Sequence, residues 1–307
     1  TGMQLAKHPA IKAIGFTGSY RAGKALFDAA AARPEPIPVY AEMGSTNPVF
    51  ILPEAMRERG RDIAKGYASS VTMGAGQFCT NPGLLFYSST NGDSFKNNIA
   101  EAFTQTTGAV MLTQKMGEAY RKGMEQHLRI DKVSQLAKGK AVETDGGGKI
   151  TPLLLAAEGE TLRDHQELTE EVFGPGSIVV STGSKEEMLS IAKSLSGHLT
   201  ATVHGTDREL EAYRDLLTIL EQKVGRIVIN GFPTGVEVCS AMVHGGPFPA
   251  TTDSKTTSVG TAAIYRFVRP VCYQQMPEAL LPEELRNKNT LHILRQVNGE
   301  RTTKNID

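Results

Sequence analysis

The sequence has 307 residues with 33 basic and 33 acidic side chains, so its formal net charge is zero. Like charges are not clustered and no apolar run approaches the length of a bilayer span, so we expect neither a nucleic-acid partner nor a membrane. The three cysteines are far apart and odd in number, which indicates a reducing, cytoplasmic compartment. The seven histidines lack the spacing of metal ligands, so we expect no metal site.

The first part of the chain is predicted to form a βαβ unit. Residues 11–19 form a strand and a glycine turn, residues 21–33 an alanine-rich helix that ends before a run of prolines, and residues 39–42 a second strand. The N-terminus of such a helix can receive a phosphate or another anion. The glycine spacing does not match a dinucleotide fingerprint, so an ordinary tight turn explains it at least as well.

Glu42 stands at the end of the second predicted strand. A carboxylate at the C-terminal end of a strand in an α/β sheet lies where ligands usually bind. Most acids in such places are only solvated, so the residue by itself leaves both interpretations open.

Cys79 lies in residues 74–83, a stretch of glycines and turn residues between a predicted helix at 54–73 and a predicted buried strand at 84–87. Glycines allow a ligand to approach the backbone closely, and reactive cysteines occupy reachable loops of this kind. Cys79 is therefore a candidate nucleophile. The alternative is that Cys79 is a small buried residue of the core, as free cysteines commonly are.

Strands and helices alternate through the middle of the chain. A helix begins near Thr113, a loop with two acids spans 170–176, and two helices open with the capping boxes Ser184/Glu187 and Thr206/Glu209. A turn is predicted at 146–148, and strands are predicted at 150–155, 177–180, 199–204 and 226–230. This alternation predicts an α/β fold with a mostly parallel sheet.

The pattern changes after residue 230. Residues 231–249 are rich in glycine and proline and have little periodicity, which is typical of binding loops in a compact enzyme. Residues 262–271 return to a strand pattern, and the polar tail from residue 277 is expected at the surface.

Four separated stretches resemble, in order, the motifs of the aldehyde dehydrogenase superfamily. They are Phe16-Thr17-Gly18-Ser19, Glu42-Met43-Gly44 with Asn47-Pro48, Gly76-Gln77-Phe78-Cys79, and Glu171-Val172-Phe173-Gly174-Pro175. Three later segments, at 229–236, 245–251 and 269–273, resemble the α-ketoglutarate semialdehyde (2,5-dioxopentanoate) dehydrogenases. The NADP-preferring fatty aldehyde dehydrogenases are a neighbouring branch.

The resemblance implies an aldehyde dehydrogenase-like α/β fold in three parts. Residues 1–43 would be the second half of a Rossmann-type nucleotide-binding domain, and residues 44–250 the catalytic domain. Residues 251–307 would supply a C-terminal strand and a surface tail for oligomerisation, as a dimer or tetramer. Family members are considerably longer, so we expect this chain to be the C-terminal part of a larger enzyme.

The resemblance also implies the roles of particular residues. Cys79 would attack the aldehyde carbon, and Glu42 would act as general base for hydrolysis of the resulting thioester. The cofactor, NADP or NAD, would lie near six residues, namely Gly18, Ser19, Met43, Gly44, Glu171 and Phe173. The other cysteines, Cys239 and Cys272, are expected to be small packing residues.

The chain departs from the family pattern at two places. Thr46 stands where many members have lysine, and Gly246-Pro247-Phe248-Pro249 replaces a widespread Pro-Phe-Gly-Gly loop. Four alternatives to an NAD(P)-dependent dehydrogenase of a short aldehyde that bears a carboxylate stay open. They are an NADP-dependent fatty aldehyde dehydrogenase, a cofactor-free thiol hydrolase or acyltransferase that pairs Cys79 with a histidine, an inactive fragment, and an oligomerisation piece.

Overall fold

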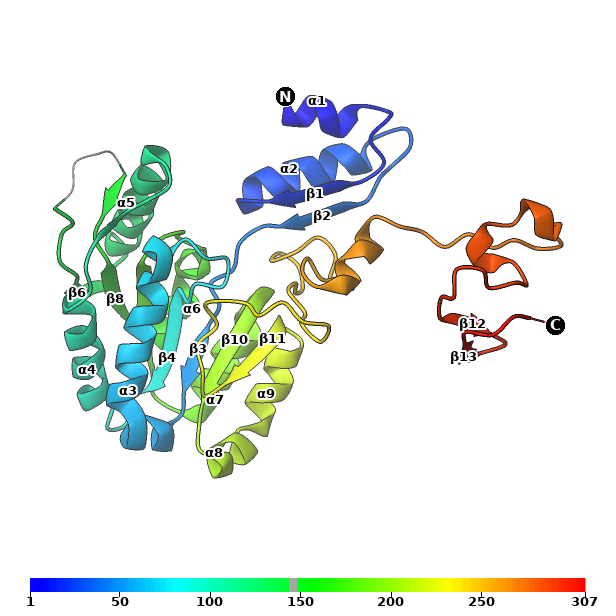
Figure 1. The fold of residues 1–307 in the computed structure, drawn as a ribbon. Coiled ribbons are helices and arrows are strands. Elements are labelled where there is room, and N and C mark those ends of the chain that lie inside the picture. The colour runs from blue at the N-terminus through cyan, green and yellow to red at the C-terminus, as the bar shows by residue number, and fades with distance from the viewer. Residues whose placement is uncertain (144–147, 307) are drawn as a thin grey trace. The chain divides into compact units, whose positions relative to one another are not determined.

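The computed structural model describes residues 1–143 and 148–306 and divides the chain into two compact units, Thr1–Arg266 and Phe267–Asp307 (Figure 1). The first unit contains all of the site residues expected from the sequence. None of the helices in these described ranges has both the length and the apolar character needed to cross a membrane.

The predicted βαβ unit is present near the start of the chain. Strands β1 (Ile14–Thr17) and β2 (Val39–Glu42) pair in parallel, and helix α2 (Tyr20–Ala31) connects them. Ser19 begins the helix, because its hydroxyl accepts a hydrogen bond from the third amide of the first turn. A short helix, α1 (Gly2–Lys7), precedes this unit. The small core of the βαβ unit is made of Ala30, Ile37, Val39, Ala41 and Met43.

A seven-stranded sheet forms the centre of the first unit, with the strand order β11-β10-β3-β4-β9-β8-β6. Its strands are β3 (Val49–Ile51), β4 (Leu84–Ser88), β6 (Ser134–Lys138), β8 (Leu153–Glu158), β9 (Gly176–Thr182), β10 (His198–His204) and β11 (Val224–Ile229). Neighbouring strands are parallel except for β6, which pairs antiparallel with β8. The expected mostly parallel α/β sheet is therefore confirmed.

Helices cover both faces of this sheet (Figure 1). One face packs against α3 (Pro53–Thr72) and α4 (Asp93–Thr104). The other face packs against α5 (Gln114–Leu128), α6 (Gly159–Asp164), α7 (Lys185–Ser194) and α9 (Arg214–Glu221). Smaller elements are η1 (Met73–Gly76), β5 (Ala109–Val110), β7 (Lys149–Ile150), η2 (Gln166–Thr169) and α8 (Asp207–Ala212). Burial on both faces explains why the central strands read as continuous apolar runs.

The two predicted capping boxes differ in the structure. Thr206 and Glu209 form the complete reciprocal box at the start of α8. Ser184 accepts a hydrogen bond from the amide of Glu187, but the Glu187 carboxylate accepts from the amide of Gly183 instead of completing the box. The capping box predicted at the start of α7 is therefore only half formed.

The strand predicted at 262–271 is wrong. Thr261–Arg266 form a 3-10 turn, η3, and residues 267–276 have no regular secondary structure. The second unit contains two short 3-10 turns, η4 (Glu278–Leu280) and η5 (Glu283–Leu285), and an antiparallel hairpin of β12 (Arg295–Val297) and β13 (Glu300–Thr302). Its tail is largely exposed. Most of the predicted turn at 146–148 lies outside the described residues.

Candidate active site

Glu42 is the last residue of β2, and its side chain is buried, with 6 % exposed surface. The chain segment at 250–252 runs beside it, because the amide of Met43 donates to the carbonyl of Ala250 at 2.8 Å and Glu42 forms an antiparallel bridge with Thr251. The irregular C-terminal loop therefore covers the end of β2. This contact brings residues far apart in the sequence to the Glu42 carboxylate.

Cys79 lies between α3 and β4, three residues after the left-handed turn η1. Gly76 has a φ of +66°, and a Cβ built on it would lie 2.2 Å from the carbonyl carbon of Gly174. Only glycine fits this close approach of two backbones. The turn brings the cysteine loop against the loop that carries Glu171 and Phe173, and Cys79 itself is a half-buried free thiol.

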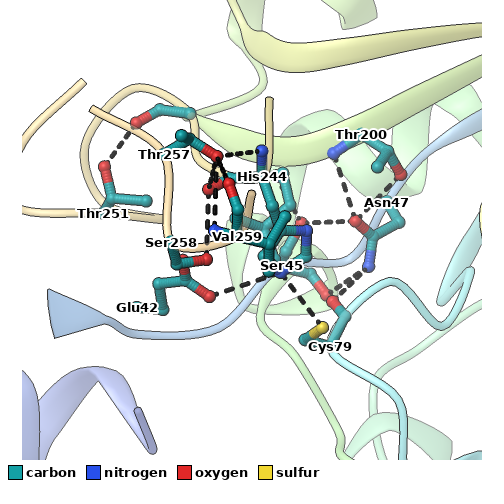
Figure 2. Close-up of polar contacts among 12 residues, drawn as sticks. Glu42, Ser45, Asn47, Cys79, Thr200, His244, Thr251, Thr257, Ser258 and Val259 are labelled. Carbon is teal, nitrogen blue, oxygen red and sulfur yellow. Dashed lines mark hydrogen bonds and ion pairs between the residues drawn. The ribbon is translucent and has the colours of Figure 1, made fainter. Parts of the chain in front are cut away.

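His244 connects the two residues that were expected to be catalytic (Figure 2). Its Nε2 lies 3.3 Å from the sulfur of Cys79 and 3.3 Å from Oε2 of Glu42. The hydrogen bond to Cys79, followed by that to Glu42, raises the pKa of the imidazole to about 9 against the effect of burial. At neutral pH the ring is therefore a cation whose Nε2 proton lies within reach of both the sulfur and the carboxylate.

The backbone around His244 is held by Thr257 and Ser258. The His244 amide donates to the Thr257 hydroxyl at 2.9 Å, and the Ser258 amide donates to the His244 carbonyl at 2.9 Å. These bonds fix the imidazole in place on an otherwise irregular loop. The sequence interpretation did not include His244 among the site residues.

Arg266 provides a second cation beside Glu42. Its Nη2 is 3.8 Å from Oε1 of Glu42, and its Nε donates to the Thr256 hydroxyl at 2.9 Å. Burial alone would raise the pKa of Glu42, but hydrogen bonds from His244 and Ser258 and the charges of His244 and Arg266 lower it on balance. Glu42 is therefore a carboxylate at neutral pH.

Asn47 fastens the cysteine loop to the central sheet. Its amide nitrogen donates to the carbonyls of Cys79 at 3.0 Å and Asn81 at 2.9 Å. Its amide oxygen accepts from the hydroxyls of Ser45 at 2.8 Å and Thr200 at 3.0 Å. Asn47 is completely buried, and Figure 2 shows it between Thr200 and Cys79. Its polar atoms are satisfied, which makes it a rigid support for the nucleophile loop.

Glu171 lies against Gly44, and Phe173 lines the same cavity as Glu171. Gly44 has a φ of +115°, which residues other than glycine rarely adopt, and Oε2 of Glu171 lies 2.7 Å from the position that a Cβ would take there. Glu171 is exposed at its edge, but loss of hydration at its carboxylate raises its pKa to about 7, and a hydrogen bond from the Ser45 amide opposes this. Glu171, Phe173 and Ser45 line one small cavity.

The remaining predicted cofactor residues lie along β1, β2 and α2. The Gly18 amide donates to the Glu42 carbonyl at 3.0 Å, and Ser19 caps α2. The Met43 side chain is buried and packs against Gly23 of α2. Only the backbone of Met43 therefore faces the segment that covers Glu42.

The expectation for the other two cysteines is wrong. Cys239 and Cys272 are exposed free thiols and not small packing residues. Both lie in irregular stretches, where no strand or helix periodicity directs a side chain into a core.

Comparisons with known proteins agree on one family. Residues 1–256 match the sequence profile described as "Aldehyde dehydrogenase family". The chain is 46% identical over 302 residues to "Alpha-ketoglutaric semialdehyde dehydrogenase 2" of Azospirillum brasilense, which covers 97% of this chain and 57% of that protein. It is 44% identical over 299 residues to "Alpha-ketoglutaric semialdehyde dehydrogenase" of Acinetobacter baylyi, again with 97% and 57% covered. The chain thus spans little more than half the length of these relatives.

Solved structures have the same fold. A variant of proline utilization A from Bradyrhizobium japonicum matches with a TM-score of 0.73 and 24% identity over 87% of this chain and 27% of that one. A gamma-glutamyl-gamma-aminobutyraldehyde dehydrogenase from Burkholderia cenocepacia matches with a TM-score of 0.72 and 21% identity over 86% and 52%. The expected aldehyde dehydrogenase-like fold is confirmed.

Proposed function

The chain belongs to the aldehyde dehydrogenase family, and on this premise we propose that the protein oxidises an aldehyde to its carboxylic acid with NAD(P)⁺. The observation that carries the proposal is the placement of one imidazole nitrogen 3.3 Å from both the Cys79 sulfur and the Glu42 carboxylate. A nucleophile, a proton carrier and a base are thereby held in one buried cluster.

The residues around Gly44 fit the reactive end of a nicotinamide cofactor. The Glu171 carboxylate is held against the backbone of Gly44 and Ser45, where it can accept hydrogen bonds from hydroxyl groups. Phe173 lines the same cavity, and the N-terminus of α2 begins at Ser19. When bound, NAD(P)⁺ supplies the hydride acceptor that turns the aldehyde adduct on Cys79 into a thioester.

Cys79 begins the reaction as the nucleophile. The imidazolium of His244 at 3.3 Å stabilises the negative sulfur, as cations beside reactive cysteines do in general. The sulfur attacks the aldehyde carbon, a C–S bond forms, and the negative charge passes to the carbonyl oxygen. Asn47 holds the carbonyl of Cys79, so the attacking atom stays in position.

Glu42 acts in the second half of the reaction. As a buried carboxylate it takes a proton from the water that attacks the thioester carbon. The C–S bond breaks, the carboxylic acid leaves, and the sulfur departs as a thiolate beside the His244 cation. Hydrogen bonds from His244 and Ser258, with the charges of His244 and Arg266, lower the pKa of this carboxyl and favour its charged form between turnovers.

The substrate we propose is 2,5-dioxopentanoate, which gives 2-oxoglutarate as the product. The names of the two relatives at 46% and 44% identity support this choice over a fatty aldehyde. The choice between NAD and NADP stays part of the proposal, as does a homo-oligomer of the complete enzyme. We also propose that residues 1–43 belong to the nucleotide-binding domain, residues 44–250 to the catalytic domain, and residues 251–307 to the C-terminal part. The three free cysteines support a reducing, cytoplasmic compartment.

A second candidate function is a thiol hydrolase that needs no cofactor. The Cys79–His244 contact favours it, because a cysteine paired with a histidine is also sufficient for ester or thioester cleavage. It predicts that ester hydrolysis proceeds fully without nicotinamide and that no aldehyde is oxidised.

The test is aldehyde-dependent NAD(P)H formation, with 2,5-dioxopentanoate and a long-chain aldehyde compared under both cofactors. We expect turnover of the acidic aldehyde, complete loss in Cys79→Ser, and a loss of about 10²–10⁴-fold in Glu42→Gln. Cys239→Ser is the matched control and should retain activity, because that thiol is exposed. Ester cleavage with no aldehyde oxidation would favour the hydrolase instead.

A further inference from the structure

Arg226, in β11, is a cation that the reaction described above does not use. It is half-buried, and no carboxylate forms an ion pair with it in the part of the chain that the structure describes. Its Nη2 donates to the Pro233 carbonyl at 2.7 Å, while its Nε is buried without a partner among the described residues. A charge withdrawn from water is costly unless an anion compensates it.

The strand register places Arg226 on the same face of the sheet as the support of Cys79. Arg226 is the parallel partner of Thr200 in β10, and the next pair, Ala201 and Ile227, belongs to the core on the opposite face. The Thr200 hydroxyl donates to Asn47, which in turn donates to the Cys79 carbonyl. Arg226 is therefore one strand away from the network that holds the nucleophile.

Two further contacts place Arg226 beside the His244 loop. A Cβ on the preceding residue, Gly225, would lie 2.2 Å from the carbonyl oxygen of Gly245, which follows His244. The Pro233 carbonyl that accepts from Arg226 belongs to the irregular segment leading to that loop. Burial lowers the pKa of Arg226, and the interaction with Cys79 acts in the opposite direction.

We propose that Arg226 binds the carboxylate of the substrate and so selects aldehydes that carry an acid group at the other end of the chain. This inference rests on the proposed aldehyde oxidation at Cys79. A guanidinium offers several donors that match a carboxylate, and an anion beside Arg226 compensates a charge that is partly withdrawn from water. An uncharged aldehyde reaches Cys79 without this contact, so Arg226 makes the site prefer an aldehyde with a carboxylate over an uncharged one.

Protection of Cys79 from iodoacetamide tests the proposal without any cofactor. An aldehyde adds reversibly to the thiol. The C–S bond forms as the carbonyl π bond breaks, and the proton of the S–H group passes to the former carbonyl oxygen, so the addition needs no oxidant or reductant and can reverse. Modification of Cys79 is followed by peptide mass spectrometry in the presence of 2,5-dioxopentanoate or uncharged pentanal. The variants are Arg226→Met and Arg226→Lys, and Arg214→Met removes an exposed arginine of α9 as the matched control.

In Arg226→Met we expect the half-protecting concentration of 2,5-dioxopentanoate to rise about tenfold or more, with that of pentanal within about twofold. Arg226→Lys should lie between, and the control should equal the unmodified protein. Unchanged protection by the acid, or an equal loss for both aldehydes, would overturn the role of Arg226. If neither aldehyde protects Cys79 in the unmodified protein, the proposed oxidation fails and this inference falls with it. The unprotected rate at Cys79 and the melting temperature show whether each variant is folded.

Discussion

Asn47 is the residue through which the cysteine loop is joined to the central sheet. It is fully buried, and its amide nitrogen and oxygen are matched to groups on the cysteine loop and on β10. Removing such a side chain leaves buried carbonyls without a donor, and each unsatisfied buried group costs free energy of folding. The stability of the protein and the position of Cys79 therefore depend on the same amide.

Asn47→Ala should lower the free energy of unfolding by about 2–4 kcal/mol, since the carbonyls of Cys79 and Asn81 both lose their donor. Asn47→Asp should also be destabilising, because it replaces the donor nitrogen with an oxygen that faces two carbonyls. Denaturant titration measures both. Asn97→Ala, at an exposed position of α4, is the control and should change stability by less than about 0.5 kcal/mol. Equal effects at 47 and 97 would contradict this account of Asn47.

The site could be predicted in part from the sequence. Cys79 and Glu42 stand in short motifs beside predictable strands and helices, and the structure brings them to one cluster through His244. His244 itself was not predicted, because it is 165 positions from Cys79 and lies in a loop without periodicity. The available signal was a single histidine directly before two glycines in a segment typical of binding loops.

At the scale of elements, Glu209 connects two helices. Its carboxylate completes the capping box of α8 and also accepts hydrogen bonds from the amides of Glu54 and Ala55 in the first turn of α3. The first amides of a helix have no partner within it, so this buried carboxylate satisfies donors that would otherwise be unpaired. Helix α3 leads directly to the cysteine loop, and its start is held by this contact.

Glu209→Gln should destabilise the protein by about 1–3 kcal/mol, because charged acceptors bind helix amides more strongly than a neutral amide does. The midpoint of chemical denaturation measures the effect. Glu211→Gln, at an exposed position two residues along the same helix, should leave the denaturation midpoint almost unchanged. If the two substitutions had the same effect, Glu209 would not be the cap of α3.

Elements could be predicted where burial and pattern agree, as in β4, β9 and β10, whose apolar runs are covered on both faces. The failed strand at 262–271 shows the limit of this reasoning. Its residues, such as Ile264 and Val268, have high strand propensity but are exposed, with no neighbouring strand in the described ranges. Strand propensity mainly measures packing against neighbours, so the sequence pattern alone could not decide the outcome.

At the scale of the whole molecule, the catalytic cluster makes stability depend on pH. The pKa of His244 is raised from 6.5 to about 9, so its contribution is complete below pH 6.5 and is lost as the pH rises through 9. The pKa of Glu42 is lowered, so its contribution is present above pH 4.5 and is lost in more acidic solution. Buried His198 and His204, with pKa values lowered to about 4, stay neutral between pH 6.5 and 9.

We therefore expect the free energy of unfolding to fall by on the order of 2 kcal/mol between pH 6.5 and 9.5. His244→Gln should remove the larger part of this dependence while lowering stability at pH 6.5. It should leave a smaller decrease near pH 7 from Glu171, whose pKa is raised to about 7 and whose contribution is lost as the pH rises through that value. Denaturant titrations of both proteins at the two pH values measure it. The same decrease in the variant would mean that other groups cause it.

Activation of Cys79 is tested by the rate at which each of the three cysteines reacts with iodoacetamide at pH 7, read by peptide mass spectrometry. Cys79 is half-buried, whereas Cys239 and Cys272 are exposed, so access alone would make Cys79 the slowest. Activation by the His244 cation predicts the opposite, with Cys79 about tenfold faster than either other thiol. If Cys79 reacted more slowly than both, it would not be an activated nucleophile, and the proposed mechanism would be wrong.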